Sequence, residues 1–451
     1  MTFAVVLQPA LTGAVPAARA DSVASTVASG GTVPVAGAEI TATTWLTERT
    51  LQLSVRSTSF RTPALVEVTF PTGYAHDTGR RWPVTYYLHG LGHDQTTFRA
   101  SYAGETLTRD YPSIVVSPNG SSGFWSDWYN FGADGPPDYE TFVVQQLIPL
   151  IDANFRTLAD RAHRVVMGES MGGYGTMMLA ARHPDMFVAA ASLSGGMDNH
   201  SLGQPVIVAG SLLSNGLPGA IYGPYLTQEV RWRGHNPVDL AGNLGNLDLQ
   251  FYTGNGTLDP SRGETLAEGS LGCLMESGII QPTSVKMHHT LLGLGIPHSW
   301  TELSWGCHSA ASFEYEISQA VRRFETVLAR PPTPPADFDH RSIEPEFQVW
   351  DWSVRADPSR ALEFLNLTGV SKRGLTLTGS GNTTVTTPPY FSSASSVTVT
   401  VDGRTMNVIP HSDGRITFQV GLGPANRQQE YTPGASTTSR TAVITFSEGD
   451  S

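Results

Sequence analysis

The stretch that decides the fold is Val165-Val166-Met167-Gly168-Glu169-Ser170-Met171-Gly172-Gly173. Two β-branched residues lead into a Gly-x-Ser-x-Gly pattern, and an apolar helical run follows at residues 177–181. A strand–turn–helix of this kind strains the serine backbone, so glycine is needed where side chains would collide. The serine hydroxyl then stands at a helix N-terminus, whose free N–H groups suit a developing negative charge. The pattern predicts that Ser170 is a nucleophile, and a tight turn without chemistry is the alternative.

Strand and helix patterns alternate on both sides of this turn. Amphipathic helices are expected at 138–155 and 311–328, and β-rich apolar runs occur at 51–55, 64–68, 84–88, 113–117, 187–193 and 247–252. The alternation predicts an α/β-hydrolase fold with a mostly parallel sheet and active residues at the carboxyl ends of its strands. Residues 197–246 lack a clean period and are expected to form a lid or pocket wall.

The composition changes after a proline-rich segment. Residues 331–335 read as a stiff linker. Beyond it Thr, Ser, Val and Gly dominate, and apolar residues alternate at 375–377, 397–401, 416–420 and 442–446. These runs predict a small all-β, sandwich-like domain. We therefore expect a catalytic domain at 38–330 and an accessory domain at 336–451.

The N-terminus predicts export. An apolar run ends in Ala18-Arg19-Ala20, which is typical of a signal-peptide cleavage site. We expect a signal peptide at 1–20, a flexible leader at 21–37 and a secreted protein. Cys273 and Cys307 are the only cysteines, and a pair in an exported chain favours one disulfide over two buried thiols.

Several partner classes are not expected. The formal net charge is −12 and there is no basic run, so nucleic acid is not a predicted partner. After the signal segment no stretch is long and apolar enough to span a bilayer. There is no metal-ligand spacing, and we expect no cofactor.

A serine nucleophile needs a base and an acid to orient that base, and in this fold both follow the serine in the chain. His308 lies directly before the last predicted helix and is the preferred base, with His298 as the alternative. Asp259, Glu264 and Glu268 are candidate acids. A disulfide between Cys273 and Cys307 would hold the Glu268 and His308 segments together, which favours Glu268.

The oxyanion hole needs two backbone N–H groups. We expect one from Met171, which follows the nucleophile, and one from Leu91 in the loop after strand 84–88. Trp125, Asp127 and Trp128 are placed to line the substrate pocket, with aromatic core packing as the alternative.

These motifs recur in order in one family. They are His89-Gly90-Leu91-Gly92, Ser117-Pro118-Asn119-Gly120, Phe124-Trp125-Ser126-Asp127-Trp128-Tyr129, Glu140-Thr141-Phe142, Gly168-Glu169-Ser170-Met171-Gly172-Gly173, Ala191-Ser192-Leu193-Ser194-Gly195, Tyr222-Gly223-Pro224 and Gly254-Asn255-Gly256. Residues 45–328 resemble the esterase family that contains esterase D, feruloyl esterases and the antigen 85 mycolyltransferases.

The resemblance implies an α/β-hydrolase with a Ser/acid/His triad. By similarity to antigen 85, the acid carries over to Glu268 and the base to His308, although Cys307 and Ala310 stand where the antigen 85 motif has Thr and Trp. His89-Gly90 stands where antigen 85 has Asp-Gly, and the His-Gly form is more common among the hydrolases of the family.

The sequence is therefore compatible with three functions. The first is a secreted serine esterase that acts on an ester or acyl-lipid substrate. The second is an acyltransferase that delivers the acyl group to a sugar or lipid hydroxyl. The third is a surface protein whose C-terminal domain binds cell-wall or polysaccharide material.

Overall fold

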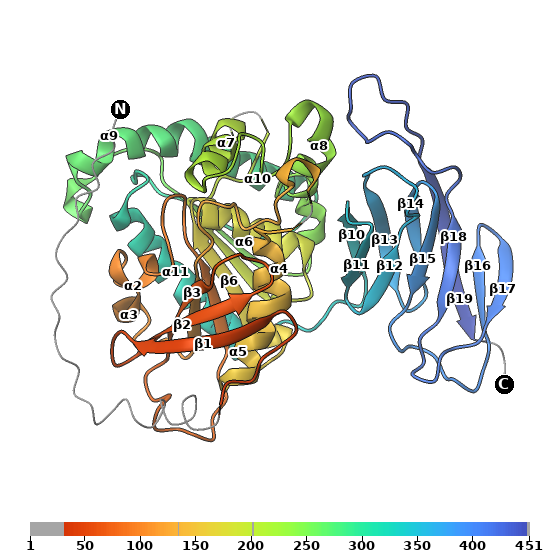
Figure 1. Ribbon diagram of the computed structural model, residues 1–451, viewed down its shortest axis with the longest axis horizontal. Coiled ribbons are helices and arrows are strands. Elements are labelled where there is room, and N and C mark those ends of the chain that lie inside the picture. The colour runs from red at the N-terminus through yellow and green to blue at the C-terminus, as the bar shows by residue number, and fades with distance from the viewer. Residues whose placement is uncertain (1–30, 134, 201–202, 449–451) are drawn as a thin grey trace.

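The computed structural model describes residues 31–133, 135–200 and 203–448, except for the side chains of 266–268 and 448. Figure 1 shows two parts, a large sheet covered by helices and a C-terminal region built of strands. The predicted signal peptide lies outside the described residues and stays a prediction. At the end of the predicted leader, the backbone of Val33 exchanges two hydrogen bonds of 2.8 Å with the Asn154 side chain.

The large sheet has nine strands in the order β1-β2-β3-β5-β4-β6-β7-β8-β9. Its first three strands and the β3–β5 pair are antiparallel, and all other neighbours are parallel. The predicted α/β-hydrolase fold with a mostly parallel sheet is confirmed. The strands are β1 (Ala38–Trp45), β2 (Thr50–Ser57), β3 (Ala64–Thr69), β4 (Val84–Leu88), β5 (Ile114–Pro118), β6 (Arg164–Glu169), β7 (Ala189–Leu193), β8 (Asp248–Thr253) and β9 (Ser299–Glu302).

The central strands are buried on both faces, which is why they read as continuous apolar runs. Successive residues of β6 enter different cores: Val166 packs in one hydrophobic cluster, and Val165 and Met167 pack in another. Helix α6 (Met171–Arg182) contributes side chains to the first cluster, and α11 (Ala310–Ala329) contributes side chains to the second.

Helix α11 shows why its segment is helical. Its buried apolar side chains recur at helical spacing: Phe313, Ile317, Ala320, Val321 and Phe324. The Ser309 hydroxyl caps its N-terminus by accepting from the Ser312 N–H. The helix expected at 138–155 is also present, as α4 (Tyr139–Thr141), the π-helical η2 (Phe142–Leu147) and α5 (Ile148–Asn154).

The remaining short elements lie between these strands. They are α2 (Thr97–Ala100), α3 (Gly104–Leu107), η1 (Asn130–Gly132), η3 (Arg161–His163), η4 (Ala241–Leu244) and η5 (Pro260–Arg262).

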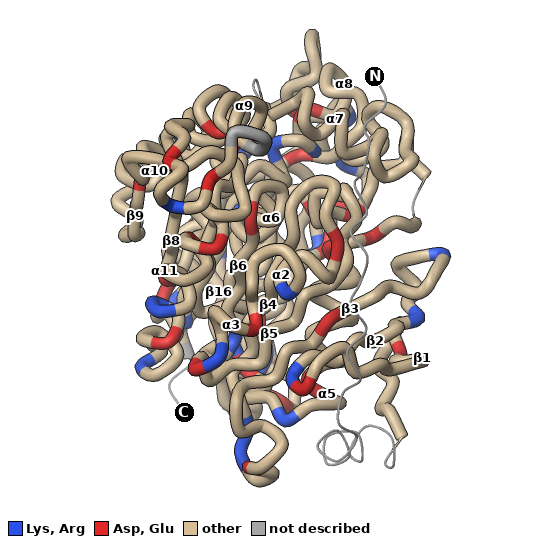
Figure 2. The backbone as a smooth tube through the Cα atoms, turned by 90° about the vertical axis from the view of Figure 1, so that its left-hand side faces the viewer, with Lys and Arg blue, Asp and Glu red and all other residues tan. Residues whose placement is uncertain are grey.

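A group of helices gathers at one end of the sheet in both views (Figures 1 and 2). They are α7 (Gln204–Leu213), α8 (Tyr225–Gly234), α9 (Leu266–Met275) and α10 (Gln281–Gly293), with the π-helical η6 (Glu276–Ile280) between the last two. No helix of the described residues has both the length and the apolar character needed to cross a membrane.

The C-terminal domain is all-β, as predicted, and packs two antiparallel sheets around its own core. One sheet has the order β10-β13-β14-β19-β16-β17 and the other β11-β12-β15-β18. The strands are β10 (Phe338–Ser342), β11 (Glu346–Val349), β12 (Trp352–Arg355), β13 (Leu365–Ser371), β14 (Gly374–Gly379), β15 (Asn382–Thr386), β16 (Val397–Val401), β17 (Arg404–Val408), β18 (Thr417–Gly421) and β19 (Arg440–Glu448).

The two domains are joined by polar contacts as well as by the linker. Arg182 of α6 lies 2.7 Å from Glu140 and 2.7 Å from Glu344, which follows β10. Asn243 pairs with the backbone of Arg341 through hydrogen bonds of 2.8 and 2.9 Å. The exact domain boundaries and the predicted binding of polysaccharide by the β domain stay predictions.

Candidate active site

Ser170 occupies a strained position between β6 and α6. Its φ is 56° and its ψ is −117°, and its N–H donates to the Leu193 carbonyl at 2.9 Å. A side chain at Gly172 would collide with the Leu88 carbonyl, and one at Gly168 would meet the Gly172 carbonyl. The two glycines therefore let the turn close as tightly as the sequence pattern predicts.

His308 lies in the loop before α11 and lines the same cavity as Ser170. Its Nδ1 is 2.7 Å from Oε2 of Glu276. Its Nε2 is buried and has no hydrogen-bond partner within the described part of the chain. Because a carboxylate only accepts, Nδ1 carries the ring proton and Nε2 is left as an acceptor.

Glu276 is fully buried at the start of the π-helical η6. Its Oε1 accepts from Ser194 Oγ at 2.7 Å, Thr253 Oγ1 at 2.9 Å and Gly254 N at 2.8 Å. Its Oε2 accepts from His308 Nδ1, so each of these hydrogen bonds brings a donor to the Glu276 carboxyl group. Such a set fits an ionised carboxylate, and π-helical turns often occur at functional sites.

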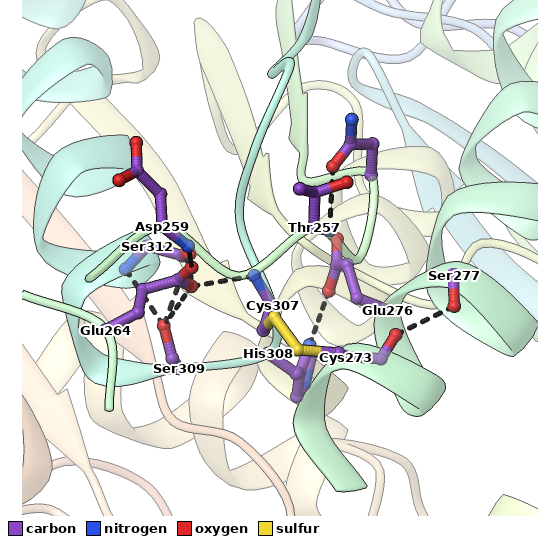
Figure 3. The surroundings of a disulfide bond; sticks show 11 residues. Thr257, Asp259, Glu264, Cys273, Glu276, Ser277, Cys307, His308, Ser309 and Ser312 are labelled. Atoms are coloured by element: carbon purple, nitrogen blue, oxygen red, sulfur yellow. Dashed lines mark hydrogen bonds and ion pairs between the residues drawn. A yellow bond between two sulfur atoms is a disulfide. The ribbon is translucent and has the colours of Figure 1, made fainter. Parts of the chain in front are cut away.

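Sequence reasoning missed Glu276. The side chain of Glu268, the predicted acid, lies outside the described residues, and its assignment stays a prediction. The predicted disulfide between Cys273 and Cys307 is confirmed. Figure 3 shows that it joins the helix carrying Glu276 to the residue before His308. The spacing between Cys273 and Glu276 could have indicated this residue. Glu276 follows Cys273 by three residues and lies on the same face of the helix, so a disulfide to Cys307 brings it towards His308.

The two other candidate acids do not contact the imidazole. Glu264 is buried, and its Oε1 accepts from Cys307 N at 2.7 Å and from the hydroxyls of Ser309 and Ser312 at 2.8 and 3.0 Å. It thus holds the loop that carries His308 (Figure 3). Asp259 accepts from the backbone and hydroxyl of Ser261 and caps a short 3-10 turn.

His298, the alternative base, has other partners. Its Nδ1 is 2.9 Å from the Ile296 carbonyl and its Nε2 is 2.7 Å from Nδ1 of His288. It is not among the residues that line the cavity of Ser170. The arrangement favours His308 as the base.

The candidate oxyanion donors lie at this cavity too. Leu91 and Met171 both line it, and Met171 is the first residue of α6. The loop of Leu91 is fixed by the buried His89, whose Nδ1–H donates to Gly90 O at 2.8 Å and whose Nε2 accepts from Gly120 N at 2.9 Å. Burial lowers the pKa of His89, which keeps this ring neutral.

The expected pocket residues Trp125, Asp127 and Trp128 make contacts with other parts of the fold. None lines the cavity, and both tryptophans are buried in the core. Asp127 accepts from the Thr141 N–H at 3.0 Å and from its hydroxyl at 2.6 Å. Burial and the nearby Glu140 charge raise the pKa of Asp127 to about 7. The Trp125 ring lies against Gly120 and Gly175, and the Trp128 ring lies against Gly216. A role of these three residues in substrate binding stays a prediction.

The cavity has a volume of about 450 Å³ and a largely apolar wall. Its apolar lining includes Phe124, Val206, Ile207, Met275, Ile279 and Ile280. Val206 and Ile207 belong to α7, so the segment expected to form a lid or wall does contribute to it. Asp198 and Asn199 add polar groups to the lining. A pocket of this size and character fits an acyl group beside Ser170.

Comparisons with known proteins agree with the motifs. The esterase Rv1288 of Mycobacterium tuberculosis (strain ATCC 25618 / H37Rv) is 34% identical over 200 residues, which cover 42% of this chain and 42% of that protein. The diacylglycerol acyltransferase/mycolyltransferase Ag85B of Mycobacterium leprae (strain TN) is 33% identical over 207 residues, covering 43% and 59%. The chain thus spans less than two thirds of the length of these relatives.

A solved structure and a family description complete the comparison. The crystal structure of Mycobacterium tuberculosis MPT51 has a TM-score of 0.49 at 20% identity, covering 60% of this chain and 96% of that one. The family model described as putative esterase matches residues 57–323, which is more than half of the chain. The resemblance drawn from the sequence motifs is confirmed, and the protein belongs to the putative esterase family.

Proposed function

We propose that the protein is a serine carboxylic-ester hydrolase with Ser170 as nucleophile, His308 as base and Glu276 as the orienting acid. One arrangement carries the proposal. Ser170 and His308 line a common cavity, and the buried Nε2 of His308 is unpaired in the described part of the chain while Nδ1 is held by Glu276. This is the environment that a serine needs to lose its proton.

The reaction proceeds in two halves. Ser170 Oγ attacks the ester carbonyl carbon as its proton passes to His308 Nε2. The carbonyl oxygen becomes an oxyanion, held by the N–H groups of Leu91 and Met171. The bond to the alcohol oxygen then breaks, and that oxygen takes the proton from His308. Water repeats the sequence on the acyl-enzyme and releases the acid and free Ser170.

Acyl transfer is the second candidate, and two observations favour it. One of the relatives is an acyltransferase by name, and the cavity wall is largely apolar. In this reaction a sugar or lipid hydroxyl takes the place of water in the second half. The triad and the oxyanion donors keep the same roles, so the two functions differ only in the acceptor.

Both candidate functions are tested by mixing the protein with a short-chain p-nitrophenyl ester and measuring the intact-protein mass and the products. We expect an acyl adduct on the wild type and none on Ser170→Ala, whose turnover falls at least about 10³-fold. Free acid as the only product, with or without added trehalose or glycerol, supports hydrolysis. An acylated acceptor supports transfer. A wild type with neither turnover nor adduct would contradict both.

We also propose that the chain is exported. Its disulfide fits an oxidising compartment, and the N-terminal segment has the pattern of a signal peptide. Sequencing the N-terminus of the mature protein tests this, and a start near Asp21 is expected. A mature protein that begins at Met1 or Thr2 would contradict it.

A further inference from the structure

A second buried carboxyl lies behind the proposed catalytic acid. Glu316 projects from α11 and is fully buried. Its Oε1 is 2.9 Å from Ser194 Oγ, and the same hydroxyl is 2.7 Å from Oε1 of Glu276. The other oxygen of Glu316 has no hydrogen-bond partner among the described residues. The ester chemistry uses Glu276 and His308 but gives Glu316 no role.

Counting hydrogens shows that one carboxyl must be protonated. Ser194 has a single hydroxyl hydrogen, yet its oxygen lies within hydrogen-bond distance of two carboxyl groups. If both were ionised, one contact would bring two acceptors together in a buried site. Glu276 already receives donors from Thr253 and Gly254 and from His308, whereas Glu316 receives none of these. The extra proton therefore belongs on Glu316.

The surroundings of Glu316 favour the neutral form. Burial and the charge of Glu276 raise its pKa well above the ordinary value, against a smaller opposing effect from the Ser194 hydrogen bond. Among the described residues, the phenols of Tyr102 and Tyr252 also interact electrostatically with Glu316. No cation acts on Glu316 in the part of the chain that the structure describes.

Ser194 is held in place for this contact. It follows β7 with a φ of 42°, in the left-handed region, and its N–H donates to the Tyr252 carbonyl at 2.9 Å. A serine in this conformation costs free energy and persists only where the surrounding structure requires it. Here the conformation aims the hydroxyl between the two carboxyl groups.

We propose that Glu316 is a protonated positioning residue, whose carboxyl donates to Ser194 Oγ so that the Ser194 hydroxyl always donates to Glu276. The proposal rests on the proposed function of Glu276. With Glu316 neutral, His308 faces one negative charge rather than two. With the Ser194 hydroxyl fixed, Oε1 of Glu276 stays occupied and Oε2 stays directed at the imidazole. No proton is transferred along this chain during turnover.

Infrared spectroscopy tests the protonation directly and independently of activity. The difference spectrum between the wild type and Glu316→Gln at pH 8 should contain the carbonyl band of one protonated carboxylic acid. Asp127 is common to both proteins and cancels. If Glu316→Gln does not fold, wild-type protein labelled with ¹³C at the glutamate carboxyls should show the same band moved by the label. A spectrum with no protonated glutamate band would overturn the proposal.

Kinetics test the positioning role. Glu316→Leu keeps the volume but removes the donor, and we expect kcat to fall about fivefold to tenfold with KM within about twofold. Glu316→Gln can donate through its amide, so it should restore most of this loss and keep the wild-type acid limb of the pH–rate profile. Ser194→Ala should resemble Glu316→Leu. The low-field proton resonance of His308 Nδ1–H should move in Glu316→Leu and Ser194→Ala more than in Glu316→Gln.

Two results would contradict the role. Wild-type kinetics in both Glu316→Leu and Ser194→Ala would show that the chain of hydrogen bonds does not position the triad. A loss in Glu316→Gln as large as that in Glu316→Leu, with a shifted acid limb, would show that Glu316 acts as an anion. Ser170→Ala serves as the inactive reference, and it should keep the infrared band even if the proposed ester chemistry is wrong.

Discussion

Replacing Glu276 by glutamine tests which carboxylate orients the imidazole. Three donors, from Ser194, Thr253 and Gly254, converge on Oε1. In Glu276→Gln they will hold the amide oxygen at that position, so the amide NH₂ must take the place of Oε2. Two donors would then face each other across the 2.7 Å contact with His308 Nδ1. The imidazole can avoid this only by moving its proton to Nε2.

The expected loss follows from that tautomer. A protonated Nε2 cannot accept the proton of Ser170, and an equivalent change in a serine protease triad lowers kcat about 10⁴-fold. A factor of this size corresponds to roughly 5.4 kcal/mol of transition-state stabilisation. We expect kcat for p-nitrophenyl ester cleavage to fall by about this factor while KM stays within a few fold, because the amide keeps the shape of the site.

Two matched variants make the test specific. Glu264→Gln changes a carboxylate that holds the same loop but does not touch the imidazole, so it should lower the Tm and reduce kcat less than about tenfold. Glu268→Gln tests the acid predicted from the sequence. The reasoning fails if Glu276→Gln keeps kcat within tenfold of the wild type, or if Glu268→Gln reproduces the large loss in a folded protein.

Three further perturbations probe the rest of the site. Gly172→Ala should abolish activity and lower the free energy of unfolding by about 3 kcal/mol or more, because its methyl group meets the Leu88 carbonyl; a denaturation midpoint like that of the wild type would contradict this. Cys273→Ser should lower stability by about 3–4 kcal/mol on loop-closure grounds, and dithiothreitol should lower the Tm of the wild type but not of the variant. Asp127 has a pKa raised to about 7 from an ordinary 3.8, so its protonated form favours the folded state below pH 4, and this contribution is lost as the pH rises to 7. The Tm of the wild type relative to Asp127→Asn should therefore fall between pH 4.5 and pH 8, and a constant difference would refute the assignment.

The fold could be predicted because its signals are local. A short sequence pattern is enough to predict the Gly-x-Ser-x-Gly turn, the buried strands and the amphipathic α11. The structure has these elements at the expected positions. The change to alternating Thr and Val after the proline linker likewise predicts the β domain. The β-domain strands hold their own hydrophobic core, which is why their pattern is independent of the catalytic domain.

The site was less predictable where a role depends on packing between distant segments. Trp125 and Trp128 belong to a motif that is easily interpreted as an aromatic pocket, yet their rings fill space beside glycines in the core. Glu276, the acid that we propose, was missed for a related reason. Asp259 and Glu264 follow β8 closely, where this fold usually places the acid, but Asp259 caps its own turn and Glu264 holds the loop of His308.

The position of Glu276 shows how the sheet still sets the geometry of a residue that does not follow a strand directly. Ser170, Ser194 and Gly254 lie at the carboxyl ends of β6, β7 and β8, and the loop of Leu91 follows β4. These are the places that an α/β sheet offers for chemistry. Glu276 comes instead from a helical segment beyond the sheet, so reasoning from strand ends could not find it. Its carboxylate is nevertheless held by Ser194 and Gly254, and the disulfide joins its helix to the segment of His308. The strand ends therefore fix the proposed acid through its hydrogen bonds, even though they do not supply it.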